Sequence, residues 1–404
     1  MRILMGMPAS ESVGGPVACE PPFVEELRRL GVQVDEEIYV YGDKLARKTR
    51  FWERILRVLR VALILRQRVS SGRYDLVHLN TTVDLKALLR DLVTVYLLHS
   101  SGSRIFLKLH GSDDQFLKTS RRLLRFLMRT LFSKVDGIGV LSTEERDNFL
   151  SFGVDKRKIF LMKCALKKAH YRRDLSFARR YNIEEGVPVL LFISRFIPTK
   201  GLIDVIRACH LLRQSGCKFA LLCVGDGPTR REAEEEVANL RLQQHVRFYG
   251  YIPERETDDF YANSDILLYP TYHFEGLPGV VLNSLAAGIP IITTRIRGTA
   301  DYLSEPDNCL WVESKQPEML AEKITQVLSQ PEVRAMMMRN NRVLAQQFTA
   351  KRVAQEYLEA YYQLIAGQAD APEPHLSQIT AAFARYQNPS PPHAGADSAL
   401  RLND

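Results

Sequence analysis

Residues 189–201 read VLLFISRFIPTKG, and residues 219–228 read FALLCVGDGP. In both, a short apolar run rich in branched side chains stops at small or charged residues, and an amphipathic segment follows. This pattern is typical of a buried strand, a turn and a helix. Both stretches therefore predict βα units of a parallel sheet.

The same rhythm recurs in two sets along the chain. Strands are expected at 3–5, 32–40, 76–79, 105–109 and 135–141, and again at 189–194, 219–224, 246–249, 266–269 and 289–293. Helical patterns lie between them, for example at 23–30 and 52–69. A polar, basic stretch at 167–186 separates the sets. The sequence thus predicts an α/β fold with two Rossmann-like lobes facing each other across a cleft.

We expect four regions along the chain. The first lobe covers 1–170 and the second 186–346, and a closing helix at 347–366 crosses back to the first lobe. Residues 367–404 are rich in proline and small side chains, which predicts a flexible tail.

The composition is that of a folded globular protein, with 404 residues, 46% hydrophobic and 25% charged. No apolar run approaches the ~18 residues that span a bilayer. The start, MRILM, enters a strand pattern directly and does not resemble a signal peptide. The six cysteines form no C-x-x-C pair, so we expect reduced, buried thiols rather than metal ligands. These features predict a cytoplasmic protein.

The positive charge is concentrated in the first lobe. Residues 1–175 hold 32 Lys and Arg against 20 Asp and Glu, a net +12, so the remainder carries −4 of the chain's +8. Two stretches, 44–68 and 118–134, interleave basic with apolar residues. A helix packed on the lobe core explains the apolar residues. The excess of basic residues predicts contact with an anionic membrane surface.

Arg195 and Lys200 lie on one strand-to-helix loop, where both can reach one anion, such as a diphosphate leaving group. Two solvated surface charges would fit the same pattern. Gly225 and Gly227 permit a tight turn with close backbone approach. A simple strand-to-helix turn explains them equally well.

The most specific stretch is 273–290, HFEGLPGVVLNSLAAGIP. Glu275 closes the loop after a predicted strand, and Gly276 and Gly279 bracket a helix start. The free amides of such a start can bind an anion or sugar hydroxyls. Asn283 lies about one turn inside that helix.

With these motifs in order, the chain resembles the retaining GT-B glycosyltransferases of the family-4 type, the glycosyl transferases group 1. The resemblance is strongest over 189–303. It implies that Arg195 and Lys200 bind the donor diphosphate and that Glu275 meets the hydroxyls of the transferred sugar. The roles it implies for other donor-binding positions fall on Gly225, Gly227, Gly276, Leu277 and Asn283.

In the first lobe, the resemblance implies a glycine-rich loop at Gly14 and Gly15 beside the diphosphate. It also implies that His110, in the stretch KLHGSD, reaches the donor sugar near the reacting carbon. Asp113 fits either a helix cap or an acceptor-side group. The first lobe receives the acceptor in this fold class.

One position departs from the family. The family usually has a second glutamate separated from the first by seven residues, and at that position this chain has Asn283. An amide still hydrogen-bonds ribose hydroxyls, but it has no charge. Weaker or altered nucleotide binding is expected, and an inactive or epimerase-like homologue stays an alternative.

The resemblance implies transfer from a nucleotide diphosphate-sugar to a glycan or lipid-linked acceptor, as in polysaccharide biosynthesis, with retention of configuration. No Asp-x-Asp signature or Cys/His cluster is visible in the sequence, so no metal or other cofactor is expected. The pI of about 9.1 leaves nucleic-acid binding as another alternative. No nucleic-acid reader motif supports it, so no nucleic-acid partner is expected. The inner face of the cell membrane is the expected site of action.

Overall fold

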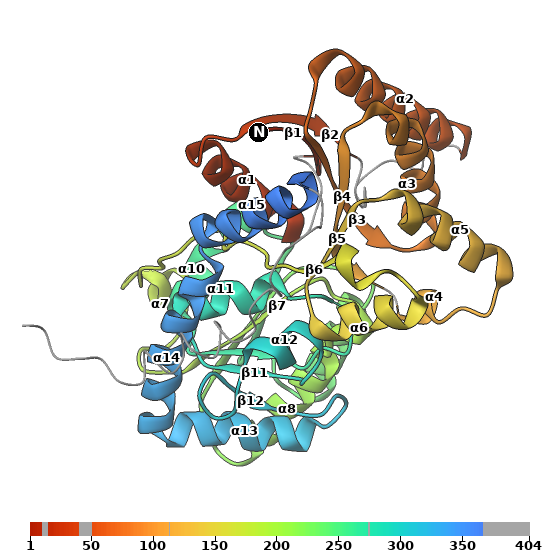
Figure 1. Ribbon diagram of the computed structural model, residues 1–404. Helices are drawn as coiled ribbons and strands as arrows, with labels where there is room; N and C mark the ends of the chain where they lie inside the picture. Colours follow the sequence, from red (N-terminus) through yellow and green to blue (C-terminus); the bar gives the residue numbers. More distant parts are fainter. Residues whose placement is uncertain (10–14, 40–50, 113, 274, 367–404) are drawn as a thin grey trace, which may run out of the picture. The chain divides into compact units, whose positions relative to one another are not determined.

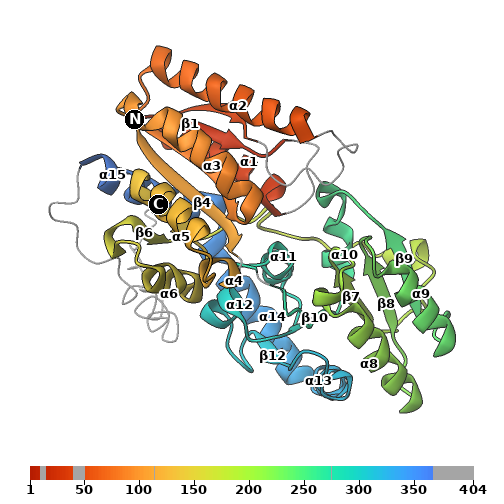
Figure 2. The ribbon, with the colours of Figure 1, turned by 90° about the vertical axis from the view of Figure 1, so that its right-hand side faces the viewer.

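The computed structural model describes residues 1–9, 15–39, 51–112, 114–273 and 275–366, which belong to one compact unit. Two six-stranded sheets, both parallel, organise these residues (Figures 1 and 2). The two-lobed α/β prediction is therefore confirmed. The tail at 367–404, Gly14, Asp113 and residues 44–50 of the basic stretch 44–68 lie outside the described residues.

The first sheet has the order β2-β1-β3-β4-β5-β6. Its strands are β1 (Arg2–Met7), β2 (Gln33–Ile38), β3 (Leu76–Val83), β4 (Arg104–Ser112), β5 (Gly137–Val140) and β6 (Ile159–Leu161). Its helices are α1 (Gly15–Arg29), α2 (Phe51–Gly72), α3 (Leu85–Leu98), α4 (Asp114–Leu117), α5 (Arg122–Lys134) and α6 (Thr143–Phe152).

The second sheet has the order β12-β11-β10-β7-β8-β9. Its strands are β7 (Val189–Ile193), β8 (Ala220–Val224), β9 (Val246–Gly250), β10 (Ile266–Tyr269), β11 (Ile291–Thr293) and β12 (Cys309–Trp311). The helices around it are α7 (Phe177–Arg180), α8 (Leu202–Gln214), α9 (Arg230–Asn239), α10 (Asp258–Asn263), α11 (Gly279–Ala287), α12 (Arg297–Tyr302), α13 (Pro317–Ser329) and α14 (Pro331–Ala345). Short 3-10 turns include η3 (Pro198–Lys200) and η4 (Glu254–Glu256).

Every predicted strand is present, with bounds shifted by a few residues. The sequence did not predict β6 and β12, which are only three residues long and lie at sheet edges. Helix α1 begins at Gly15, well before the predicted start at Phe23, and continues through Pro21 and Pro22. Its buried face, with Phe23 and Leu27 fully covered, holds it on the sheet despite the low helix propensity of proline.

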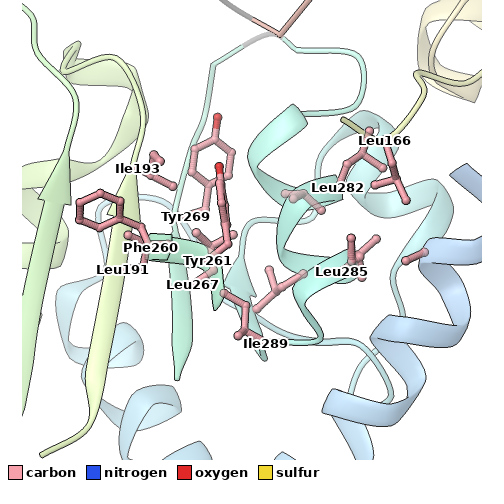
Figure 3. Packing of buried hydrophobic residues seen from close by; sticks show 14 of the residues in the cluster. Leu166, Leu191, Ile193, Phe260, Tyr261, Leu267, Tyr269, Leu282, Leu285 and Ile289 are labelled. Atoms are coloured by element: carbon pink, nitrogen blue, oxygen red, sulfur yellow. The ribbon is translucent and has the colours of Figure 1, made fainter. Parts of the chain in front are cut away.

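Alternate residues of each strand face opposite cores. In β7, Leu191 and Ile193 face the core that contains α11, whereas Leu190 and Phe192 face the core under α8. Figure 3 shows Leu282 and Leu285 of α11 packed beside strand residues such as Leu267. The start of α11, where the sequence placed the site, is therefore anchored by a continuous apolar core.

The closing helix α15 (Ala350–Ala366) packs against α1 on one face of the first sheet (Figure 1). Tyr357 and Tyr361 are fully buried in the core that contains Ile3 and Phe23. The expected return of the C-terminal helix to the first lobe is confirmed. Helices α2, α3 and α5 cover the other face of that sheet (Figure 2). In the described ranges, no helix combines the length and apolar character needed to cross a bilayer.

Candidate functional site

The order of the strands marks one place in each sheet where connections leave in opposite directions. In the second sheet this point lies between β7 and β10, and in the first between β1 and β3. Ligands of open parallel sheets bind beyond the carboxyl ends of the strands at this point. The loops after β7 and β10 carry Arg195, Lys200 and Glu275, so the topology brings these predicted residues together.

Lys200, Glu275 and the last residue of β10, Tyr269, form one polar cluster. The Lys200 ammonium donates to the Tyr269 hydroxyl at 2.6 Å and pairs with Glu275 Oε1. The Tyr269 hydroxyl donates to Glu275 Oε2 at 2.7 Å. Lys200 is 3% exposed, so these two partners hold its ammonium in one position away from solvent. The sequence did not single out Tyr269, although its place at a strand end was a signal.

The surroundings change the acidity of both charged groups. Burial lowers the pKa of the Lys200 ammonium, although Glu275 opposes the shift. Burial would raise the pKa of Glu275, but the neighbouring ammonium of Lys200 outweighs it and the pKa is lowered. An anionic ligand placed beside Lys200 would favour its charged form in the same way.

Arg195 leaves a buried donor available. Its Nε is buried and has no hydrogen-bond partner within the part of the chain that the structure describes. An unpaired buried donor costs about 1–3 kcal/mol, which a bound acceptor would recover. This observation fits an anion site at the loop after β7.

Gly225 and Gly227 support the Arg195 loop. Their φ angles are +137° and +154°, and a Cβ on Gly225 would lie 1.8 Å from the Ser194 carbonyl oxygen. The Phe196 amide donates to the Asp226 carbonyl at 2.9 Å. The two predicted glycines thus allow the β8 turn to pack directly on the β7 loop. Helix α9 begins at Arg230, directly after this turn.

Gly276 and Leu277 lie between Glu275 and α11, which begins at Gly279 after Pro278. A Cβ on Gly276 would lie 2.6 Å from the Leu141 side chain of the first lobe, so only glycine fits there. The Gly276 carbonyl accepts from the Gly298 amide at 2.9 Å. The loop is therefore fixed against both lobes.

Asn283 is 3% exposed on α11, and its amide nitrogen donates to Glu254 Oε1 at 2.8 Å. Glu254 comes from η4, after β9. Burial raises the pKa of the Glu254 carboxyl, although Lys167 opposes the shift. Position 283 has no carboxylate, but the Glu254 carboxylate of η4 lies next to it. The sequence did not predict Glu254.

His110 lies near the end of β4. Asn80 donates from Nδ2 to the Gly6 carbonyl at 3.0 Å, so its oxygen faces His110 Nε2 at 2.7 Å. Nε2 therefore carries the proton in this arrangement. Burial, and next Lys108, hold the pKa of His110 well below its usual value, so the ring is neutral at physiological pH.

Gly15, the first residue of α1, brings the first lobe up to α11. A Cβ on Gly279 would lie 4.0 Å from the Gly15 Cα. Arg297 of α12 adds a second link between the lobes, because it is 2% exposed and donates to the Ser112 carbonyl at 2.7 Å. The Thr143 amide donates to Asp301 at 2.7 Å. These contacts place His110 and the Glu275 loop in one neighbourhood.

Two protein-family models match the sequence of this chain. The model described as "Glycosyl transferases group 1" matches residues 176–343, and the model described as "Glycosyltransferase Family 4" matches residues 22–166. The chain belongs to the group 1 glycosyltransferases. The family assignment made from the motifs is therefore confirmed, and the chain is a member of a transferase family.

Among curated relatives, the 2-deoxystreptamine glucosyltransferase of Streptomyces kanamyceticus is 31% identical over 46% of this chain and 48% of its own length. A Campylobacter jejuni α-1,4-N-acetyl-D-galactosaminyltransferase, named for a PP-undecaprenol-linked saccharide, is 25% identical over 61% of this chain and 65% of its own. The chain spans about half the length of several such relatives.

Solved structures share the fold. A sucrose-phosphate synthase from Thermosynechococcus elongatus superposes with a TM-score of 0.72 at 20% identity, covering 90% of this chain and 99% of that one. The Anabaena protein HepE, solved in complex with UDP-glucose, gives a TM-score of 0.69 at 15% identity, covering 89% and 99%. The two-lobed architecture is thus the GT-B fold of these glycosyltransferases.

Proposed function

We propose that this glycosyltransferase moves a sugar from a nucleoside diphosphate-sugar to a hydroxyl acceptor, with retention of anomeric configuration and without a metal ion. The observation that carries the proposal is the cluster at the β7–β10 switch point. There a buried ammonium and an unpaired arginine Nε lie on one loop. Two cations so placed suit a diphosphate better than any neutral ligand.

In this proposal Arg195 and Lys200 bind the donor diphosphate and stabilise it as it leaves. Glu275 then accepts hydrogen bonds from the hydroxyls of the sugar. The amides of Gly276 and Leu277 support the sugar and the phosphates, and neutral His110 contacts the sugar near its reacting carbon. Gly225 and Gly227 lie in the turn beside the donor, and Gly15 begins α1 next to it.

The bond from the sugar C1 to the diphosphate oxygen breaks while the acceptor oxygen bonds to C1 on the same face. The acceptor proton passes to the departing phosphate oxygen. No protein nucleophile takes part, and the cationic side chains supply the charge stabilisation that a metal would give elsewhere. UDP-glucose is the first donor to test, because HepE binds it on the same fold.

A lipid-linked saccharide or a glycan is the proposed acceptor, and the membrane is the proposed place of work. The Campylobacter relative is named for an undecaprenol-linked substrate. Trp52 on α2 is 71% exposed, and Leu123 and Phe126 on α5 are 68% and 65% exposed. Basic residues surround them, and both helices pack on α3. Such a surface suits anionic headgroups on the cytoplasmic face of a membrane.

A donor screen followed by product analysis tests the proposal. The melting temperature should rise with one class of UDP-, GDP- or ADP-sugar, because binding to the folded state stabilises it. Proton NMR of the product should then show the anomeric configuration of the donor. Inversion would refute the mechanism. Donor binding without transfer to any glycan or lipid-linked acceptor would favour the epimerase-like or inactive alternative suggested by Asn283.

A further inference from the structure

Two cysteines and the site histidine converge next to the proposed donor site. Cys19 lies on α1, His110 lies near the end of β4, and Cys164 follows β6 in the segment that leads to the second lobe. One donor atom from each lies within 4.8 Å of the other two. Cys19 and Cys164 are 7% and 6% exposed, and the His110 side chain is 4% exposed. Three separate elements thus bring two sulfurs and an imidazole into one buried place.

Glu20 adds an unsatisfied acceptor to this place. Its Oε1 lies 3.4 Å from Cys19 Sγ and 3.5 Å from His110 Nε2, and it pairs with Lys108 at 2.6 Å. Its Oε2 is buried and has no hydrogen-bond partner among the described residues. A buried carboxylate oxygen in that state is destabilising unless a bound group satisfies it. The cluster is therefore polar and incomplete as it stands.

The charge of the cluster suits a divalent ion. The Lys108 ammonium already balances the Glu20 carboxylate. If both thiols lose their protons when a divalent ion binds, two negative and two positive charges are added together. The buried region then gains no net charge, and its existing ion pair is kept.

We propose that Cys19, Cys164 and His110 bind a thiophilic divalent ion of the Zn²⁺ type. Sulfur and imidazole ligands select zinc over magnesium or calcium, which prefer oxygen. Three protein ligands leave a fourth position for water, whose hydrogen the unpaired Glu20 oxygen can accept. Binding releases two protons and oxidises nothing.

Occupancy has a consequence that rests on the proposed function. The ion holds His110, which then no longer contacts the donor sugar. It also ties α1 to the segment around Cys164, which joins the lobes. Zinc is therefore an inhibitor at this site, and transfer itself stays independent of metal.

Cobalt titration of the full-length chain, with reduced thiols and no donor, tests the site. One equivalent of Co²⁺ should give a thiolate-to-metal band in the near ultraviolet and the visible bands of a tetrahedral ion. Cys19→Ser and Cys164→Ser should each lose the thiolate band and weaken Zn²⁺ binding by at least about tenfold. Cys217→Ser, a half-buried cysteine outside the cluster, should keep both.

No thiolate band in the wild type would overturn the site, as would an equal loss in Cys217→Ser. If Cys19→Ser does not fold by circular dichroism, Cys164→Ala and His110→Gln decide in its place. The titration contains no donor, so it tests the metal site separately from the proposed transferase function. Either proposal can fail while the other stands. In a separate assay, Zn²⁺ should inhibit wild-type turnover but not the residual turnover of Cys164→Ser.

Discussion

Lys200 is a charged side chain that burial and two hydrogen-bond partners hold in one position. Its ammonium has two anchoring partners, Tyr269 and Glu275, and almost no contact with water. A buried ammonium is destabilising unless an anion accompanies it, so its retention beside the switch point favours a binding role.

Lys200→Ala should lower turnover by at least about tenfold, because one preorganised donor to the leaving group is lost. Lys218→Ala is the matched control, since Lys218 is an exposed lysine on the same lobe. Steady-state kinetics with the identified donor give the measurement, and circular dichroism verifies folding. Wild-type turnover in folded Lys200→Ala would refute the diphosphate assignment.

Asn283 is a buried neutral side chain next to a carboxylate. Because Glu254 already supplies a carboxylate 2.8 Å away, restoring the usual family glutamate should be harmful. Asn283→Glu should lower the free energy of unfolding by about 1–3 kcal/mol, since a buried carboxylate is placed against the half-buried one of Glu254 and a hydrogen bond is lost. Urea denaturation measures it.

The double variant Asn283→Glu/Glu254→Gln should recover most of that stability, because the amide and the carboxylate have exchanged positions. Glu254→Gln alone keeps an acceptor and is the control. A fully stable Asn283→Glu would contradict the contact.

At the scale of elements, α2 and α5 place exposed apolar and basic side chains on one side of the first sheet. Arg57→Glu/Arg122→Glu should weaken binding to anionic vesicles by about 30-fold or more, at about 1 kcal/mol per basic residue. Binding should also fall steeply with salt. Co-sedimentation with anionic and neutral vesicles gives the measurement.

The charge-matched control is Arg172→Glu/Arg179→Glu, which reverses two exposed arginines outside these helices. Equal sedimentation with neutral and anionic vesicles would remove the membrane surface from the proposal. The donor assignment would be untouched, because it rests on the second sheet.

The packing of α15 on the first sheet carries a pH dependence. His78 is fully buried, and its Nδ1 lies 2.5 Å from the Tyr361 hydroxyl of α15. Burial holds the pKa of His78 well below 6.5. Below pH 6.5 His78 binds a proton in the unfolded chain but stays neutral in the folded chain. The contribution of His78 to stability is therefore complete above that pH and is lost as the pH falls.

The loss should reach at most about 1.4 kcal/mol for each pH unit below the unfolded value. His78→Gln should flatten the acid slope of the unfolding free energy, whereas His99→Gln, an exposed histidine, should leave it unchanged. Equal slopes in His78→Gln and the wild type would show that this ring titrates normally.

For the molecule as a whole, three cationic side chains of the second lobe lie at or beside the proposed donor site: Arg195 and Lys200 after β7, and buried Arg297, which reaches the first lobe at the Ser112 carbonyl. We therefore expect full activity in the presence of EDTA. If traces of zinc occupy the Cys19–Cys164–His110 site, chelation should raise activity. A loss on chelation that Mg²⁺ or Mn²⁺ restores would show that the reaction needs a metal.

The sequence by itself determined the strands and the loops that carry Arg195, Lys200 and Glu275. Buried parallel strands are continuous apolar runs, and site loops begin where those runs stop, so both signals are local in the chain. The same holds for the family, because its motifs lie within short stretches of the second lobe.

Only the tertiary structure decided which residues meet. Asn283 with Glu254, Cys19 with Cys164, and Arg297 with the Ser112 carbonyl are far apart in sequence and depend on strand order and lobe packing. Helix α1 runs through Pro21 and Pro22 because burial of its apolar face outweighs local propensity. Which side chains become partners depends on contacts between residues far apart in sequence, and the net stability is a sum over all such contacts. A local sequence pattern therefore predicts neither.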